Sequence, residues 1–335
     1  MSRSAFDIPG YSLLYEQAAH DLQNYRRIAA KTINLLRIPS SPTILDLGCG
    51  TGISTEEIIH TYPDARVFGI DSTNPFLELA RYKFGKPYTD PLLSDIAKNT
   101  PLPSILRERC NIKNLDSYLT ATKKILEPRS SQVQFIQADA ASLTDVLSEQ
   151  VDAVVANQVL HWFRKKNEGG NAGPNLAYEQ AVLQAVWTTL KDYGSFGFNL
   201  SGWDYQFDNS QMNQEHVSKH PFYLYFLESL EKRFGEVSQA QEKAFNDKEV
   251  FRVMKENNFS IQSRETQKLH YSPEGILEVC LVGGYMQIFQ KAGIELPASE
   301  QDMILEEAVR YAFAHSSPDQ GHVQENLMHY VARKE

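Results

Sequence analysis

The feature that most limits the fold is a glycine-rich turn behind a short apolar run. The run is Thr43–Leu47, and glycines stand at positions 48, 50 and 52. Because glycine has no Cβ, such a turn can bend sharply and lie directly against a ligand. We therefore predict a buried strand over 43–47, a ligand-binding loop, and a helix over 52–61 that begins with free N–H groups.

Strand-like and helix-like segments alternate after this turn. We expect further strands over 66–71, 133–138, 152–157, 195–200, 260–269 and 326–332, and helices over 74–84, 176–190 and 248–257. Strands separated by helices of this length indicate βαβ units and a mainly parallel sheet. The predicted class is α/β: a Rossmann-like, seven-stranded, mostly parallel sheet with helices on both faces.

Three segments are too long to be simple connections in such a fold. They cover residues 86–131, 201–246 and 271–317, whereas an ordinary αβ connection has roughly 2–6 residues. We predict one domain over 1–335 with a cofactor-binding core at 42–200. The insertions are expected to form a helical cap over the carboxyl edge of the sheet, where ligands bind. Surface decoration is the alternative interpretation.

Composition narrows the possible partners. The formal net charge is −9, and an acidic surface argues against nucleic acid as a partner. The three cysteines are widely spaced, so neither a zinc site nor metal dependence is expected. No signal peptide or stretch of roughly 18 apolar residues is seen, which predicts a soluble, cytoplasmic protein with no membrane contact. The oligomeric state is left open.

The spacing of the glycines separates two kinds of ligand. A nicotinamide site needs G-x-G-x-x-G, but the third glycine of that pattern is missing whether the count starts at Gly48 or Gly50. Asp46 stands two residues before the first glycine. A carboxylate there would repel a pyrophosphate and attract an ammonium group. The loop therefore favours a ligand that carries an amino acid moiety.

The run Leu45–Gly52 resembles motif I of the class I S-adenosylmethionine-dependent methyltransferases. The resemblance extends in order over about Tyr11–Leu200, apart from the first insertion, and the last two strands fit the family's antiparallel hairpin. It implies S-adenosylmethionine as the cofactor, bound by Asp46, Gly48, Gly50 and Gly52. It also implies that Asp71, at the end of the second strand, binds the ribose hydroxyls.

The same resemblance supplies the remaining cofactor contacts. Asp139 and Ala140, after the third strand, resemble the segment that meets the adenine amino group. Asn157 ends the fourth strand and completes the cofactor-binding set. Tyr15 belongs to a helical N-terminal segment that covers the cofactor in similar enzymes.

The triplet Leu160-His161-Trp162 bears on the methyl acceptor. It resembles the substrate-facing segment of small-molecule carboxyl methyltransferases. A carboxylate is ionised at neutral pH and needs no base, so Trp162 could orient it through the indole N–H. His161 could bind substrate, or act as base for a hydroxyl or amine. The alternative for Trp162 is packing under the sheet edge, and the alternative for His161 is a structural role, which is the more frequent one for histidine.

We therefore expect O-methylation of a carboxylate on a sizeable, largely apolar small molecule, whose identity the sequence does not give. N- or C-methylation of a specialised metabolite is the first alternative. A non-catalytic cofactor-binding protein is the second.

Overall fold

The computed structural model describes most of the chain in separate stretches. They are residues 10–87, 112–163, 176–201, 205–206, 221–235, 245–282, 294, 296–316 and 323–335. The chain forms two compact units, of which the first comprises Met1–Leu200, Val250–Glu265 and Met328–Glu335. The second comprises Ser201–Glu249 and Thr266–Leu327, and so contains the ranges of the second and third predicted insertions. The first insertion falls in the first unit.

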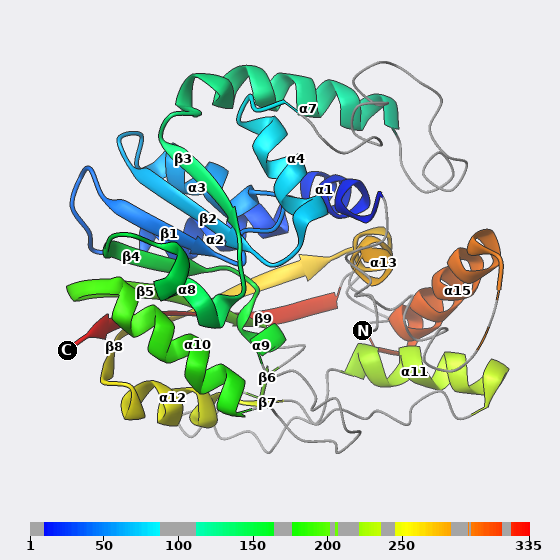
Figure 1. Ribbon diagram of the computed structural model, residues 1–335. Helices are drawn as coiled ribbons and strands as arrows, with labels where there is room; N and C mark the ends of the chain where they lie inside the picture. Colours follow the sequence, from blue (N-terminus) through cyan, green and yellow to red (C-terminus); the bar gives the residue numbers. More distant parts are fainter. Residues whose placement is uncertain are drawn as a thin grey trace. The chain divides into compact units, whose positions relative to one another are not determined.

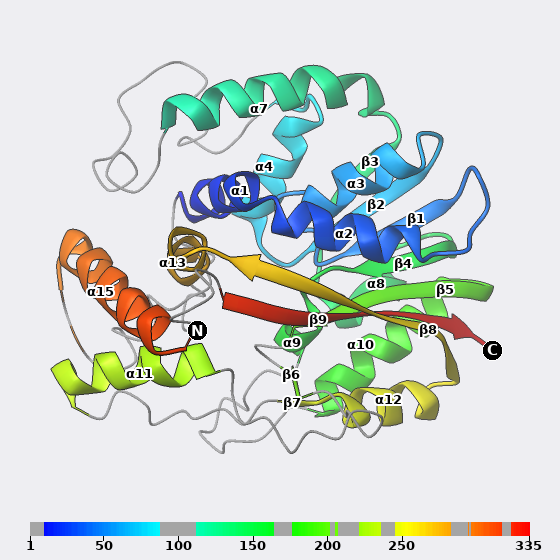
Figure 2. The ribbon, with the colours of Figure 1, turned by 180° about the vertical axis from the view of Figure 1, so that it is seen from behind.

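A seven-stranded sheet is the central element, as the sequence predicts. Its strands are β1 (Thr43–Leu47), β2 (Arg66–Asp71), β3 (Val133–Gln137), β4 (Val151–Ala156), β5 (Leu190–Ser201), β8 (Phe259–Tyr271) and β9 (Val323–Lys334). The order across the sheet is β3-β2-β1-β4-β5-β9-β8. All four pairings between β3 and β5 are parallel, while β8 and β9 run in opposite directions (Figure 2). The carboxyl ends of β1, β2 and β4 therefore lie together at one edge.

Helices cover both faces of the sheet in the first unit (Figure 1). The helical elements of this unit are α1 (Tyr11–Leu22), α2 (Asn24–Asn34), α3 (Ile53–Thr61), α4 (Asn74–Lys83), α7 (Ile112–Leu126), η2 (Glu127–Arg129), η3 (Ala140–Ser142), α8 (Leu143–Val146), α9 (Leu160–Phe163), α10 (Leu176–Thr189) and most of α12 (Asp247–Glu256). Both views place α2 and α3 on one face, and α8 and α10 on the other. This arrangement is the predicted α/β architecture.

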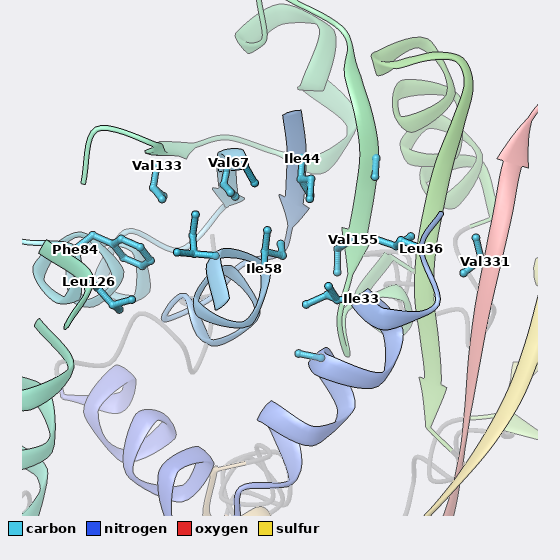
Figure 3. Packing of buried hydrophobic residues seen from close by; sticks show 14 residues of the cluster. Ile33, Leu36, Ile44, Ile58, Val67, Phe84, Leu126, Val133, Val155 and Val331 are labelled. Atoms are coloured by element: carbon cyan, nitrogen blue, oxygen red, sulfur yellow. The ribbon is translucent and has the colours of Figure 1, made fainter. Parts of the chain in front are cut away.

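The core between the sheet and the α2–α3 layer is aliphatic. Ile33 of α2 and Ile58 of α3 are fully buried against Ile44 and Val155 of the central strands (Figure 3). Burying one such side chain contributes roughly 1.5–3 kcal/mol. Central strands of a parallel sheet are buried on both faces, which explains the continuous apolar runs of β1 and β4. This packing fixes the strand ends that carry the site.

Strand β5 differs from its predicted bounds. The sequence predicts a helix to residue 190 and a strand from 195, but β5 begins at Leu190, directly after α10. Leu190 pairs with Val151 and Ser195 pairs with Ala153, so three residues of β5 are extra at this point. Tyr193 has a left-handed φ of 63° within the irregularity. A bulge of this kind is not visible in hydrophobic periodicity, because it breaks the period of two.

The second unit is mainly helical where it is described. Its helices are α11 (Pro221–Phe234), α13 (Pro273–Val282) and α15 (Ala298–Ser316), and it has a two-stranded sheet of β6 (Tyr205–Gln206) and β7 (Phe245–Asn246). Helix α15 packs against both α11 and α13. The helical character predicted for 271–317 is thereby confirmed in its described parts. That this unit covers the acceptor stays a prediction.

Candidate active site

The glycine loop lies between β1 and α3, where the sequence predicts it. Gly48, Gly50 and Gly52 have φ angles of 68°, 53° and 86°. Side chains with a Cβ rarely adopt these values, so glycine is required at each position. The backbone N–H groups of Gly48 and Cys49 donate to the carbonyl oxygen of Ile70, at 2.7 and 3.0 Å. The loop is therefore held against the carboxyl end of β2.

Asp71 ends β2 and binds this loop directly. Its Oδ2 accepts from the Gly50 N–H at 2.9 Å, and its Oδ1 accepts from the Thr73 N–H at 2.8 Å. Burial raises the pKa of Asp71, and the two N–H groups oppose that rise. A carboxylate has about four acceptor sites. Each oxygen therefore keeps capacity to accept from a ligand hydroxyl.

Asp46 lies deeper than the sequence alone indicates. Its side chain is fully buried, and its oxygens accept from Ser54 Oγ at 2.8 Å and Thr55 Oγ1 at 2.5 Å. Burial raises its pKa to about 6, although these hydroxyls favour the ionised form. In this arrangement Asp46 ties the end of β1 to the first turn of α3. Its predicted contact with the ammonium group stays a prediction.

Asp139 follows β3 and is exposed. Its Oδ1 accepts from the Ala141 N–H and from the Tyr178 hydroxyl, both at 2.8 Å. Ala140, also predicted in the site, begins the 3-10 turn η3 that this hydrogen bond caps. Both of these bonds are made to Oδ1, and within the described ranges no hydrogen bond is made to Oδ2, which can therefore accept from an amino group. Tyr178 was not predicted, because it comes from α10, almost forty residues later in the chain.

Tyr15 lies on α1, beside the ring of Phe76 at a centroid distance of 5.3 Å. The Tyr11 ring stacks on the same Phe76 at 6.3 Å. Burial raises the pKa of Tyr15 well above its usual value, with smaller contributions from Tyr25 and from Asp71. The Phe76 ring in turn lies 3.5 Å from the position of a Cβ at Gly50. The aromatic group of α1 thus adjoins the loop, and its predicted role as a cover over the cofactor stays a prediction.

The loop after β4 closes the other side of the glycine turn. Asn157 is half-buried, and Gln158 has a left-handed φ of 55°. A Cβ at position 48 would lie only 2.3 Å from Cγ2 of Val159. Glycine at 48 is therefore needed for two reasons, its φ angle and the close approach of Val159. Val159, which follows the predicted residue Asn157 by two positions, is thus the neighbour of the predicted Gly48.

The two residues predicted to face the acceptor lie on α9. His161 is half-buried. Trp162 belongs to the same short helix, but its side chain lies outside the described residues. Their roles stay predictions. Phe163 is buried and packs edge-on against Tyr178, which shows how α9 is held to α10.

Comparison with known families matches this region of the chain. Two family models, each described as a methyltransferase domain, match residues 44–104 and 102–198. The matches include the glycine loop, Asp71, Asp139 and the β4 loop. Residues 44–198 are a class I S-adenosylmethionine-dependent methyltransferase domain. The predicted fold class and cofactor are confirmed.

Relatives with curated names match only a short part of this methyltransferase domain. A trans-aconitate 2-methyltransferase from Paracidovorax citrulli is 41% identical over 71 residues, which are 21% of this chain and 26% of that protein. A malonyl-[acyl-carrier protein] O-methyltransferase from Acetivibrio thermocellus is 32% identical over 85 residues, or 25% and 27% of the two chains. The chain thus spans about a quarter of the length of these relatives.

Solved structures resemble the chain at low identity. The phosphoethanolamine N-methyltransferase 2 of Haemonchus contortus, in complex with S-adenosyl-L-methionine, aligns over 99% of this chain and 60% of its own, with 12% identity and a TM-score of 0.48.

The residues of this methyltransferase domain fit its cofactor. Asp71 offers spare acceptor sites for the two ribose hydroxyls, and Asp139 Oδ2 offers one for the adenine amino group. Among the described residues, no group of three or more His, Cys, Asp or Glu could hold a metal ion. Within the same ranges, no helix is long and apolar enough to cross a membrane. Independence from metal stays a prediction.

Proposed function

We propose that this protein transfers the methyl group of S-adenosylmethionine to a small molecule, preferably to the carboxylate of a sizeable, largely apolar acid. The observation that carries the proposal is the hydrogen bond from the Gly50 N–H to Asp71 Oδ2, at 2.9 Å. It places a carboxylate with spare acceptor sites beside a half-buried glycine turn at the carboxyl edge of the sheet. Ligands of open α/β sheets bind at this edge.

The preference for a carboxylate has two supports. The segment Leu160-His161-Trp162 resembles carboxyl methyltransferases, and the relatives named above methylate trans-aconitate and malonyl-[acyl-carrier protein] by name. A carboxylate with a pKa near 4 is already nucleophilic at neutral pH. An enzyme for such an acceptor has to orient it and exclude water, without a general base.

Each predicted residue then has a defined task. Asp71 and Asp139 hold the ribose and the adenine, which fixes the direction of the sulfonium methyl. The bound cofactor supplies an electrophilic methyl group, and S-adenosylhomocysteine leaves after transfer. Trp162 donates its indole N–H to one oxygen of the acceptor carboxylate, while the other oxygen forms the new bond to carbon. His161 lies next to it and takes no proton in this reaction.

The test is a pH–rate profile after an acceptor screen. Release of S-adenosylhomocysteine is measured with trans-aconitate, salicylate and long-chain fatty acids. With the acid that is methylated, the rate should stay flat from about pH 6 to 9, because the acceptor is ionised throughout. Trp162→Phe should cost about 0.5–3 kcal/mol in kcat/KM, through loss of one N–H donor. His161→Asn should have the milder effect.

Two outcomes would overturn the carboxylate assignment. One is a steep rise near pH 6.5 that disappears in His161→Asn, which would show that His161 removes a proton from a hydroxyl or amine. The other is methylation of amines but of none of the acids. Cofactor binding without turnover on any acceptor would favour a non-catalytic protein.

A further inference from the structure

A single buried side-chain amide, that of Asn199 in β5, is hydrogen-bonded to the loop after β4. Its side chain is 2% exposed and makes four hydrogen bonds. Nδ2 donates to Thr32 Oγ1 at 3.0 Å and to Asn157 Oδ1 at 2.8 Å. Oδ1 accepts from Gln158, at 3.0 Å from the backbone N–H and at 2.8 Å from Nε2. Both polar atoms of the Asn199 side chain, Oδ1 and Nδ2, are therefore hydrogen-bonded, and these partners fix the orientation of the amide.

The backbone N–H of Gln158 fixes the direction of the whole arrangement. It can only donate, so the atom of Asn199 that faces it must be the oxygen. The NH2 group of Asn199 must then face Asn157, whose Oδ1 accepts the hydrogen bond. As a result, the NH2 group of Asn157 is turned away from Asn199. No bond among the described residues uses the Asn157 NH2 group as a donor.

Asn157 stands next to the glycine loop. β1 and β4 are paired in parallel, with Asp46 opposite Val155, and Val159 packs on Gly48. The loop itself has few donors left. The N–H groups of residues 48 and 49 bind Ile70, that of Gly50 binds Asp71, and that of Gly52 binds Cys49. Most N–H groups of the loop are therefore already in use, so a side-chain donor beside it would add a binding group for an anionic part of a ligand.

We propose that Asn157 donates its amide NH2 to a carboxylate of the bound ligands, and that Asn199 is the positioning residue that enforces this polarity. The inference rests on the proposed function, since it concerns ligands of that site. Two carboxylates could be the acceptor of this hydrogen bond. One belongs to the methionine moiety of the cofactor, and the other to the substrate acid.

Reversal of the polarity tests the proposal. Asn157→Asp replaces the donor by an oxygen, while Asn199 can still donate to it. Asn199→Asp keeps the acceptor for Gln158 but turns its second oxygen toward Asn157, whose amide then rotates and presents its own oxygen to the ligand. Thr32→Ser is the matched control, because it keeps the hydroxyl that accepts from Asn199. Calorimetry compares S-adenosylhomocysteine with its decarboxylated analogue, which keeps the amine.

Both Asp variants should bind S-adenosylhomocysteine about 10- to 100-fold more weakly and bind the decarboxylated analogue as wild type does. Thr32→Ser should bind both compounds as wild type does. If S-adenosylhomocysteine binding is unchanged but KM for the methylated acid rises by a similar factor, the substrate carboxylate is the partner. If Asn199→Asp does not fold, Asn157→Asp, on a half-buried side chain, still decides the donor role.

The inference is overturned if neither carboxylate loses affinity in Asn157→Asp, or if both cofactor compounds weaken equally. Wild-type protein that does not bind S-adenosylhomocysteine at all would instead refute the proposed function. The two failures are therefore distinguishable.

Discussion

Two buried polar networks flank the glycine loop, and they differ in charge. The ionic cluster joins α1, α2, α3, α4 and α7, and consists of Glu16, Arg26, Glu56, Lys83 and Tyr118. The amide network joins α2, β5, β9 and the β4 loop, and consists of Thr32, Asn157, Gln158, Asn199 and His329. The first fixes the helix that carries Tyr15, and the second fixes the loop that carries Asn157.

The ionic cluster stabilises through charge balance. Lys83 is fully buried, with Nζ at 2.7 Å from Glu16 Oε1 and at 2.5 Å from Glu56 Oε1. Burial would raise the pKa of Glu16, but the charge of Lys83 and its hydrogen bond hold that pKa below its usual value. A buried charge that loses its partner costs more than the pair contributes. We expect this cluster to govern stability.

The amide network, by contrast, fixes which atoms of its side chains donate and which accept hydrogen bonds. Its members are neutral, and the bonds of Asn199 to Thr32, Asn157 and Gln158 each have a defined donor and acceptor. Burial lowers the pKa of His329 to about 4, with a further contribution from Lys31, so the ring is uncharged at neutral pH. Loss of one bond in such a network costs less than loss of a buried charge. We expect this network to govern the geometry of the site more than its stability.

The largest expected effect is on the ionic cluster. Lys83→Met fills a similar space but removes the cation that pairs with buried Glu16 and leaves Glu56 with Arg26 alone, and should lower the free energy of unfolding by about 3–5 kcal/mol. Urea denaturation measures the change. Lys232→Met is the control, because the Lys232–Glu228 pair is exposed and its loss should not be measurable. Equal losses of unfolding free energy in the two variants would refute the claim that the buried ionic cluster governs stability.

The second effect is a pH dependence from His329. Its pKa is about 4 in the folded protein and about 6.5 when unfolded, so the unfolded chain takes up the proton first as pH falls. The neutral His329 ring therefore contributes fully to the free energy of unfolding above about pH 6.5. As pH falls from 6.5 toward 4, this contribution is lost, and the free energy of unfolding falls by roughly 3 kcal/mol. His329→Gln should remove this part of the acid sensitivity. Identical acid profiles for wild type and variant would contradict the assignment.

The smallest effect is expected at Thr32. Thr32→Val removes the oxygen that accepts from Asn199 and that lies 2.8 Å from His329 Nδ1. Unfolding free energy should fall by about 1–2 kcal/mol. Thr32→Ser keeps the hydroxyl and should retain most of the stability. A loss in Thr32→Val as large as in Lys83→Met would show that the neutral network carries more stability than its bonds predict.

The two networks and the glycine loop also differ in how far they can be predicted from the sequence. The glycine loop, Asp71 and Asp139 are predictable, because each follows a strand with strong local signals. The ionic cluster is not, because Glu16, Glu56 and Lys83 look like ordinary surface charges until three helices bring them together. Asn199 gives no signal either, since an amide at a strand end acquires meaning only from Gln158 and Asn157. Ser54 and Thr55 could have been expected, because hydroxyls in the first turn of a helix often bind nearby carboxylates.

The acceptor half of the site depends on tertiary structure even more. His161 and Trp162 follow β4 by a few residues, and their predicted roles toward the acceptor rest on a short triplet that does not specify which groups surround it. This is why the cofactor could be predicted from one motif, whereas identifying the acceptor needs an experiment.

We expect the loop at Gly48–Gly52 and Asp71 to bind S-adenosylmethionine together. Calorimetric titration of wild type and Asp71→Ala with S-adenosylhomocysteine tests it most directly. Wild type should bind one equivalent, and Asp71→Ala should bind about 10- to 100-fold more weakly, because the ribose hydroxyls lose a charge-assisted acceptor. Its circular dichroism spectrum should stay that of wild type. No binding by wild type, or equal affinity in Asp71→Ala, would show that this loop and Asp71 do not form the cofactor site.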